Sequence, residues 1–453
     1  MSPARVAIIG AGPSGFYAAE ALLEYSGRPI QVDMFDRLPT PFGLVRGGVA
    51  PDHQKIKSVT RVYDKIAMRP GFRFLGNVTF GVDLTCADMQ THYHAVVVAS
   101  GADTDRRMGI PGEDAAGSHA ATDFVGWYNG QPERAELRFD LSHEHAVVVG
   151  NGNVAVDVAR ILVAGADALA ATDIADHALD ALARSAVRHV DVLGRRGPAQ
   201  AAFTPKEIRE LAELPGVALV VDPADLALDA VSEAHLDDDA RKVMTALHTV
   251  AGRTPASGDR VVRLRFLCAP MAIVGTGRVQ GVELGDNVIV DDDGPRAQPT
   301  GRSAFVPAGL VLRAIGYRGT ATPGLAFDER RGVIPSRDGR ILDSVDGASH
   351  VGWYVAGWIK RGPTGVIGTN KPDARSTVQS LLADLESGVL PTPPVSSENL
   401  DRLLAERCDR VVSYDDWQVL DAIERKAGDR DGRPRRKFTT VAAMLGALDG
   451  AVA

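Results

Sequence analysis

The sequence of 453 residues is poor in cysteine: it has three, Cys86, Cys268 and Cys408, and they lie far apart. No two of them form a Cys-x-x-Cys redox pair, and their spacing fits no iron–sulfur cluster motif. The chain therefore lacks both the dithiol of a disulfide reductase and cysteine ligands for a cluster of its own.

Two further absences narrow the class of protein. No stretch is long and apolar enough to span a membrane, and the net charge of −8 argues against nucleic acid as a partner. The N-terminus leads directly into a predicted strand, which leaves no room for a secretory signal, so we predict a cytoplasmic protein. The composition, 45% hydrophobic and 24% charged, is ordinary for a globular protein, and the length allows two or three domains.

What the chain does contain is a glycine-rich dinucleotide motif close to its start. Residues 6–15 read VAIIGAGPSG, with a buried-strand pattern before the glycines and a helical pattern after them. Gly10 permits the tight turn, Gly12 lets a pyrophosphate approach the backbone, and Gly15 lets the helix pack on the strand. The next predicted strand, 29–35, ends at Asp36, where a carboxylate grips ribose hydroxyls and repels a 2′-phosphate. This copy predicts FAD or NAD rather than NADP; the alternative is a glycine turn without a ligand.

A second copy of the motif follows at residues 146–155, AVVVGNGNVA. Ala155 replaces the third glycine, which the motif tolerates, and the next predicted strand, 187–193, ends in Gly194-Arg195-Arg196. Guanidinium groups suit bidentate contact with phosphate, so Arg195 and Arg196 predict a site for the 2′-phosphate of NADP. The alternative is a solvated surface pair.

Two motifs with opposite charges at the ribose position predict two different dinucleotides in one protein. This arrangement can pass a hydride from one nucleotide to the other. Because the chain has no cysteine pair and no cluster of its own, electrons that leave a flavin here must go to an acceptor outside the chain.

We predict an α/β protein with two Rossmann-like dinucleotide-binding domains, the NADP domain inserted in the FAD domain, and a small, mainly helical C-terminal extension. The FAD domain would comprise residues 1–105 and 319–388, and the NADP domain residues 106–318, with an added helix near 173–180. Strands expected at 94–102, 309–317 and 353–358, and a helix at 374–386, complete these domains.

Beyond the proline-rich break at residues 390–394, helical patterns occupy 399–408, 417–426 and 441–448. The basic run 430–437 is expected to be a solvated loop, with a contact for an acidic protein partner as the alternative. The sequence leaves the role of the extension, 389–453, open.

These motifs together resemble the adrenodoxin reductase type of ferredoxin–NADP reductase, in its actinobacterial form. The resemblance covers about residues 5–388 and includes two segments outside the glycine motifs: 38–53, with LPTPFGLVR and VAPDH, and 357–370, GWIKRGPTGVIGTN. Such a family member is a flavoprotein oxidoreductase that transfers a hydride from NADPH to FAD and then single electrons to a ferredoxin-like iron–sulfur protein. The family usually has Glu where this chain has Asp36, a shorter arm that keeps the charge.

The resemblance implies site residues for both cofactors, FAD and NADP(H), and no metal. For FAD they are Gly10, Gly12, Ser14, Gly15, Asp36, Leu44, Phe80, Trp358, Gly365, Val366 and Ile367. For NADP they are Arg106, Asn151, Gly152, Asn153, Val154, Arg195, Arg196, Glu207 and Gly365.

His53 and Glu210 match family positions near the isoalloxazine and the nicotinamide, and are our candidate catalytic residues. For His53 the alternative is a helix-capping or packing role. Hydride transfer needs no obligatory acid or base, so these residues would orient the rings and tune the flavin.

Two other functions remain open from the sequence. One is the electron-input flavoprotein of another NADPH-dependent system, similar to the glutamate synthase small subunit, although such chains usually carry cysteine clusters. The other is a non-catalytic NADP-sensing flavoprotein. A ferredoxin is acidic, so a local basic face is expected despite the negative net charge. The candidates for it are Lys55, Lys57, Arg61, Lys360 and Arg361.

Overall fold

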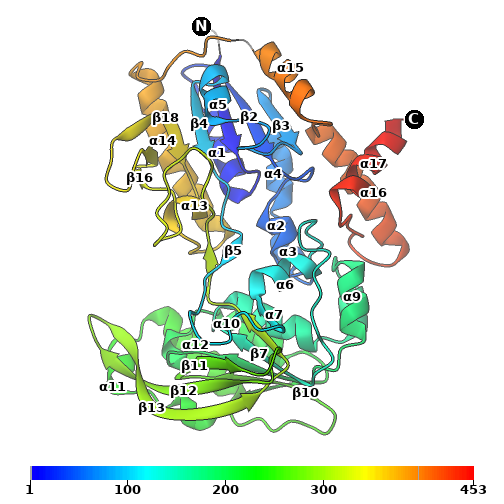
Figure 1. Ribbon diagram of the computed structural model, residues 1–453, viewed down its shortest axis with the longest axis vertical. Helices are drawn as coiled ribbons and strands as arrows, with labels where there is room; N and C mark the ends of the chain where they lie inside the picture. The colour runs from blue at the N-terminus through cyan, green and yellow to red at the C-terminus, as the bar shows by residue number, and fades with distance from the viewer. Residues whose placement is uncertain (1–2, 396, 453) are drawn as a thin grey trace. The chain divides into compact units, whose positions relative to one another are not determined.

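The computed structural model describes residues 3–395 and 397–452, and the chain divides into two compact units. Unit 1 comprises the described parts of Met1–Val49, His53–Thr104 and Tyr317–Ala453. Unit 2 comprises Asp105–Gly316 with the short segment Ala50–Asp52. In sequence, unit 2 is therefore inserted within unit 1 (Figure 1).

Unit 1 is built on a seven-stranded sheet with the order β16-β17-β18-β4-β1-β2-β3. Its strands are β1 (Ala4–Ile9), β2 (Ile30–Asp36), β3 (Phe72–Gly76), β4 (Ala95–Val98), β16 (Ser336–Arg337), β17 (Arg340–Leu342) and β18 (Ser349–Val355). The five strands from β18 to β3 run parallel, and β16 and β17 add an antiparallel edge. The predicted strands near both ends of the chain thus meet in one sheet, because β18 pairs with β4.

Helices cover both faces of this sheet. They are α1 (Pro13–Leu23), α2 (Leu44–Gly47), α3 (Gln54–Lys57), α4 (Thr60–Ala67), α5 (Cys86–His92), α13 (Trp358–Arg361), the 3-10 turn Ile367–Thr369, α14 (Asn370–Glu386), α15 (Ser397–Arg407), α16 (Tyr414–Arg430) and α17 (Val441–Val452). Alternate residues of β1 enter opposite cores: Val6 and Ile8 pack with α1, whereas Ala7 and Ile9 face the other side.

The three C-terminal helices are part of unit 1 rather than an appendage to it. Leu400 and Leu404 of α15 enter the core on one face of the sheet. Trp417 and Leu420 of α16, with Met444 of α17, enter the core on the opposite face. The helical patterns predicted after residue 390 are confirmed, and the structure shows that they close the hydrophobic core of unit 1.

Unit 2 has a six-stranded parallel sheet with the order β6-β14-β7-β8-β10-β9. Its strands are β6 (Ser118–Ala120), β7 (His145–Val149), β8 (His189–Leu193), β9 (Val217–Val221), β10 (Arg260–Arg265) and β14 (Leu310–Arg313). Its helices are α6 (Ala121–Tyr128), α7 (Asn153–Val163), α8 (Ala166–Ala170), α9 (Asp176–Ala183), α10 (Pro205–Ala212), α11 (Ala230–Ala234) and α12 (Asp238–Val250), with 3-10 turns at Pro198–Gln200 and Pro223–Leu226. Helix α9 is the added helix that the sequence predicted.

Unit 2 also has an antiparallel sheet that the sequence analysis did not predict. It consists of β11 (Cys268–Val274), β12 (Gly281–Asp291) and β13 (Pro295–Pro307). One face of it packs on the main sheet through residues such as Leu284 and Val306. A further two-stranded sheet pairs β5 (Thr104–Asp105) with β15 (Tyr317–Arg318).

Candidate dinucleotide-binding sites

The first glycine turn joins β1 to α1 and leaves no room for side chains at two of its glycines. Gly10 has φ of 106°, and a Cβ there would lie 2.5 Å from the carbonyl oxygen of Ala99. A Cβ at Gly15 would collide with the carbonyl oxygen of Gly10, so close packing of α1 on β1 requires glycine. At Gly12 a Cβ would meet nothing within 4 Å, which leaves open space in front of the turn.

That open space lies at the start of α1. Gly12 is the N-cap residue and supplies no side-chain acceptor, so the first N–H groups of the helix point toward the space with the positive end of the helix dipole. Ser14 is held beside it, because its hydroxyl donates to Oδ1 of Asn370 at 3.0 Å. Asn370 begins α14, so the starts of two helices meet at this turn.

Asp36 ends β2 next to the same turn. Its Oδ2 accepts the backbone N–H of Ala11 at 2.9 Å, and its Oδ1 accepts that of Leu38 at 3.0 Å. These two bonds fix the direction of the carboxylate at the edge of the turn, where the motif places the acid that accepts from a ribose hydroxyl.

The sequence analysis did not single out Phe42, whose backbone contacts the glycine turn. Phe42 donates its N–H to the carbonyl of Ala11 at 2.7 Å, and its φ is 83°, in the left-handed region. The helix α2, which holds the predicted residue Leu44, follows directly. The only signal in the sequence was the run of turn residues, Leu38 to Gly43, before that helix.

The remaining residues expected near FAD lie in two other parts of unit 1. Trp358 begins α13, and its Nε1 donates to a carbonyl of the loop that follows. That loop carries Gly365, with φ of 78°, and Val366, which is 62% exposed. Ile367 packs at the edge of the core that contains α1, and Phe80 packs against Trp353 with ring centroids 6.1 Å apart.

The second glycine turn repeats the geometry of the first. Gly150 has φ of 135°, and a Cβ there would collide with the carbonyl of Ala314. Gly152 is the N-cap of α7 without a side-chain cap, and a Cβ there would meet its nearest neighbour, Cβ of Ala202, at 4.0 Å. Asn153 is anchored, because its Oδ1 accepts the N–H of Thr204 at 2.8 Å. Val154 follows in the first turn of α7.

Asn151 carries a buried donor inside this turn. Its carbonyl accepts the N–H groups of Ala202 at 2.9 Å and Phe203 at 3.1 Å, which fixes the backbone. Its side-chain Nδ2 is buried, and within the described residues it has no hydrogen-bond partner. A buried amide without an acceptor is costly, so a ligand oxygen at this turn would satisfy it.

Arg195 and Arg196 follow β8, beside the same turn. Arg195 is exposed and Arg196 is half-buried, and neither guanidinium has an acidic partner among the residues that the structure describes. Burial and the neighbouring charge of Arg195 lower the pKa of Arg196, as expected for two like charges without a counter-ion. Asn287 of β12 donates to the carbonyl of Arg195 at 2.9 Å, so the unpredicted sheet holds the backbone of the pair.

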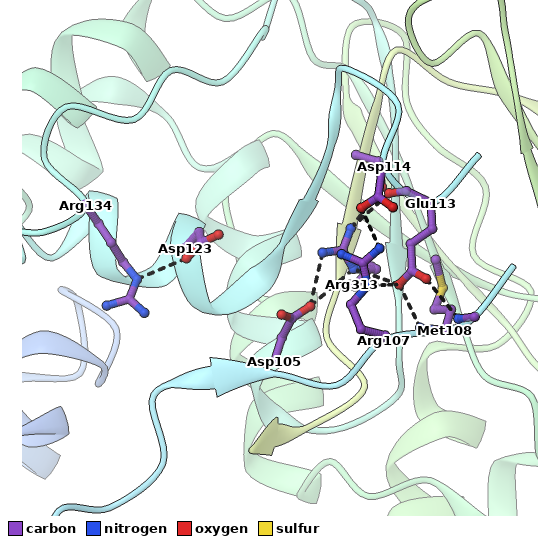
Figure 2. Close-up of polar contacts among 10 residues, drawn as sticks. Asp105, Arg107, Met108, Glu113, Asp114, Asp123, Arg134 and Arg313 are labelled. Atoms are coloured by element: carbon purple, nitrogen blue, oxygen red, sulfur yellow. Dashed lines mark hydrogen bonds and ion pairs between the residues drawn. The ribbon is translucent and has the colours of Figure 1, made fainter. Parts of the chain in front are cut away.

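Arg106 is exposed, and it lies in sequence between residues of an ion cluster around Arg313. Figure 2 shows this cluster, with Asp105, Arg107 and Glu113 beside Arg313. Arg313, 5% exposed, pairs with Asp105 at 3.1 Å and with Glu113 at 3.3 Å. Arg107 reaches Glu113 at 3.5 Å, and Glu113 also accepts two backbone N–H groups of the same loop. The residues on both sides of Arg106 are thereby tied down, while its own guanidinium is exposed.

Glu207 and Glu210 lie on α10 within a cluster of charged groups of unit 2. Glu207 is buried, and Glu210 pairs with Lys206 at 2.9 Å. Burial, together with the two glutamates, raises the pKa of Asp157 on α7 well above its usual range. The neighbouring Arg160 pairs with Asp157 and with Asp52 of the VAPDH segment. Asp52 of the VAPDH segment and Asp157 of α7 thus share one cation, Arg160, and all three residues belong to unit 2.

His53 occupies the N-cap position of α3 in unit 1, but its side chain does not cap that helix. It is buried, with 8% of its surface exposed. The helix-capping alternative is therefore wrong for its side chain. His53 belongs to unit 1 and Glu210 to unit 2.

The expected basic face needs correction. Lys57 is buried, Lys360 pairs with Asp373 at 3.0 Å, and Arg361 donates to Asn370 at 2.9 Å. Lys360 and Arg361 therefore serve contacts inside unit 1, and burial withdraws Lys57 from the surface. Lys55 and Arg61 are exposed, and the structure gives their side chains no ion pair within the described residues.

The basic run 430–437 is a solvated loop only in part: Arg430 and Arg436 are exposed, whereas its other three cations are buried or paired. Arg433 and Lys437 are buried, and Arg435 pairs with Asp421 at 2.6 Å and with Glu424 at 3.1 Å. The charge pattern failed here because the acids that neutralise this run lie on α16, in residues whose helical pattern gave no sign of a buried charge.

The residues of both turns fit dinucleotides. The first combines open space, uncapped helix amides and an anchored carboxylate, which suits the phosphates and ribose of FAD. The second combines uncapped amides, the buried donor of Asn151 and two arginines for which residues 3–395 and 397–452 supply no acidic partner, which suits NADP.

Three comparisons with known proteins agree with this geometry. The chain is 47% identical over 451 residues to NADPH-ferredoxin reductase FprA of Mycobacterium leprae (strain TN), covering 97% of each chain. It belongs to this family of reductases. It is also 42% identical to the mitochondrial NADPH:adrenodoxin oxidoreductase of Salvelinus fontinalis, over 98% of this chain and 91% of that protein. The structure of Mycobacterium tuberculosis FprA in complex with NADPH matches with a TM-score of 0.94 and 46% identity, over 99% of this chain and 100% of that one.

The adrenodoxin reductase resemblance and the predicted fold class are thus confirmed. A model of the pyridine nucleotide-disulphide oxidoreductase family matches residues 4–214. The three cysteines of this chain are free thiols and form no disulfide with one another. The match therefore supports the fold, and it does not indicate a disulfide reductase. Within the described residues, no helix has the length and apolar character needed to cross a membrane.

Proposed function

We propose that this reductase transfers electrons from NADPH through FAD to a small iron–sulfur protein of the ferredoxin class. The observation that carries the proposal is the contrast between the two turns. The first has an anchored carboxylate, Asp36, and the second has Arg195 and Arg196, which have no acidic partner in the part of the chain that the structure describes. The names of the FprA and adrenodoxin oxidoreductase relatives support the donor and the acceptor.

In this proposal the chain binds and orients the cofactors. FAD, when bound, accepts two electrons from a nicotinamide and releases them singly, which the side chains of the protein cannot do. The helix amides after Gly12 and Gly152 hold the pyrophosphates, Asp36 accepts from the ribose of FAD, and Arg195 and Arg196 hold the 2′-phosphate of NADPH. We retain His53 as a candidate near the isoalloxazine, and Glu207 and Glu210 as candidates near the nicotinamide.

We assign the docking of the acidic partner to the exposed side of α3 and α4, which we call the α3–α4 surface. It carries Lys55, Arg61 and Lys65. Three partly exposed apolar side chains lie among them, Ile56, Val62 and Met68. Helix α4 also carries Asp64, whose carboxylate accepts a hydrogen bond from the hydroxyl of Tyr414 at 2.5 Å and is part-buried there. A basic surface with apolar side chains in a protein of charge −8 suits a small acidic electron carrier.

The experiment that tests the function uses the purified protein and a ferredoxin. We expect a yellow protein whose visible flavin absorbance is bleached by NADPH without oxygen and restored by oxidised ferredoxin. A colourless protein that still binds NADP would overturn the proposal. Bleaching followed by dye reduction, with no reduction of any ferredoxin of the host, would overturn the acceptor and favour another NADPH-dependent system. We expect the reaction in the cytoplasm, which fractionation of host cells tests.

A further inference from the structure

The segment Phe42–Gly47 is the backbone that lies directly on the first glycine turn. Besides the bond from Phe42 to Ala11, a Cβ on Gly43 would lie 3.0 Å from Cα of Gly12. Phe42 has φ of 83°, a conformation that a residue with a side chain keeps only when its surroundings enforce it. The side chains that hold this segment in place therefore also fix the backbone that contacts the dinucleotide turn.

The groups that hold it come from the C-terminal helix α16, far away in sequence. The indole of Trp417, 2% exposed, meets the ring of Phe42 edge to face, with centroids 5.7 Å apart. The guanidinium of Arg46 lies 5.1 Å from the centroid of the same indole. Trp417 thus contacts the segment at two places: at Phe42, whose backbone is strained, and at Arg46 near the other end.

Glu424, two turns further along α16, also binds Arg46. Its side chain is fully buried, and its two oxygens accept from the guanidinium of Arg46 at 2.5 and 2.9 Å. Arg435 donates to Glu424 at 3.1 Å, and the N–H of Phe438 donates at 2.9 Å. Burial opposes the ionisation of Glu424, but Arg46 and Arg435 outweigh it and keep its pKa below the usual value. The carboxylate is therefore a charged, fully bonded anchor for Arg46.

We propose that Trp417 and Glu424 are positioning residues for FAD, which hold the segment Phe42–Gly47 against the glycine turn that receives the cofactor. This assigns a role to the part of the chain after residue 390, for which the sequence gave none. The inference rests on the proposed function, because it takes the first turn as the FAD site.

The chain offers a matched control. Asp401 on α15 binds Arg73 of β3 at 2.9 Å, so it also ties the C-terminal part to the sheet of unit 1 through an acid–arginine pair. Within the described residues, the hydrogen bonds and ion pairs of Asp401 and Arg73 involve no residue of the segment Phe42–Gly47. Asp401→Asn therefore removes a more exposed acid–arginine tether of the C-terminal part, and Arg73 keeps its pair with Asp33.

The experiment compares the purified holoproteins of Glu424→Gln, Trp417→Phe and Asp401→Asn with the parent. The rate of FAD release is followed by the rise of free-flavin fluorescence, next to the visible flavin spectrum and the thermal midpoint. We expect at least tenfold faster release and a shifted flavin spectrum for Glu424→Gln and Trp417→Phe, with parental values for Asp401→Asn. The KM for NADPH should stay unchanged in all three when FAD is saturating, because the NADP residues of unit 2 are intact.

Parental FAD release in Glu424→Gln and Trp417→Phe would overturn the inference. So would equal acceleration in Asp401→Asn, since release would then follow general loosening of unit 1. If Glu424→Gln does not fold, Trp417→Phe decides, because it keeps an aromatic ring and every charge. The outcomes are separable from the proposed function: a parent protein without FAD defeats that function, whereas a parent that reduces ferredoxin with unchanged variants defeats only the positioning role.

Discussion

Asp36 binds the N–H of Ala11 at 2.9 Å, so the acid that ends β2 is fixed to the middle of the glycine turn after β1. The other oxygen of the same carboxylate holds the N–H of Leu38. One short side chain thereby joins the ends of two neighbouring strands and is already oriented before a ribose arrives. The short arm of this aspartate reaches both backbone groups.

Replacing this acid tests the FAD assignment. In Asp36→Asn the amide keeps one acceptor but turns an NH2 group toward one of the two backbone N–H donors, and the charge is lost. Because hydrogen bonds to a charged group contribute about 1.5–3 kcal/mol, we expect FAD binding about 10- to 100-fold weaker. Titration of the apoprotein with FAD measures it. Glu386→Gln, an exposed partner of Tyr25, is the control and should bind FAD as the parent does.

Choice between NADPH and NADH should depend on the arginine pair after β8. Neutral Gln at Arg195 and Arg196 removes two charge-assisted contacts to a 2′-phosphate, so we expect the KM for NADPH to rise by about 10- to 100-fold per arginine. The KM for NADH should change little, because NADH lacks that phosphate. Steady-state dye reduction with both nucleotides measures this. Arg253→Gln is the control, because the guanidinium of Arg253 donates to the backbone carbonyls of Ala212 and Thr249. Equal losses for NADPH and NADH would show that the pair does not read the phosphate.

Charge reversal on the α3–α4 surface should affect the acceptor alone. With Lys55, Arg61 and Lys65 changed to Glu, we expect the KM for ferredoxin to rise at least tenfold and to lose most of its dependence on salt, since charge attraction at a surface is screened by ions. Reduction of a small uncharged dye should proceed as in the parent. An unchanged KM for ferredoxin would place docking elsewhere on the protein.

His94 should make the stability of the protein depend on pH. Burial, together with the nearby charges of Arg28 and Arg5, lowers the pKa of His94 from 6.5 to about 4. Between pH 6.5 and about 4, His94 is protonated in the unfolded chain but neutral in the folded chain. The free energy of unfolding therefore falls as the pH drops through this range. Denaturant unfolding at several pH values measures the slope. In His94→Asn, whose amide oxygen can still accept the N–H of Arg5, this part of the slope should disappear; its persistence would assign it to other groups.

The parts of the fold that the sequence predicted depend on short-range patterns. Each glycine turn is specified by its own strand, glycines and helix, because Gly10 and Gly150 need positive φ and Gly15 lies against a carbonyl. The helices after residue 390 were visible from their periodicity. The sheet β11–β13 was not, since its strands mix exposed polar residues with glycine and proline and have little regular alternation.

The site divides in the same way. The spacing of Asp36 and the arginine pair from their glycines was readable, because a strand of fixed length carries each to the edge of the turn. Partners supplied from afar were not readable: Asn370 for Ser14, Asn287 for the backbone of Arg195, and Glu424 for Arg46. A single polar residue inside a helix or strand gives no sign of which distant group it will meet.

The sequence by itself determined that the chain holds two dinucleotide turns of opposite charge preference and no redox cysteines, because residue identity and local spacing set those properties. Only the tertiary structure decided which charges remain available. It removed Lys57 and Lys360 from the surface by burial or pairing, together with Arg433, Arg435 and Lys437 of the run 430–437. Within the described residues it left Arg195 and Arg196 without an acidic partner. The physical reason is that neutralisation of a charge depends on distance in space, and folding brings acids such as Glu424 to cations hundreds of residues away.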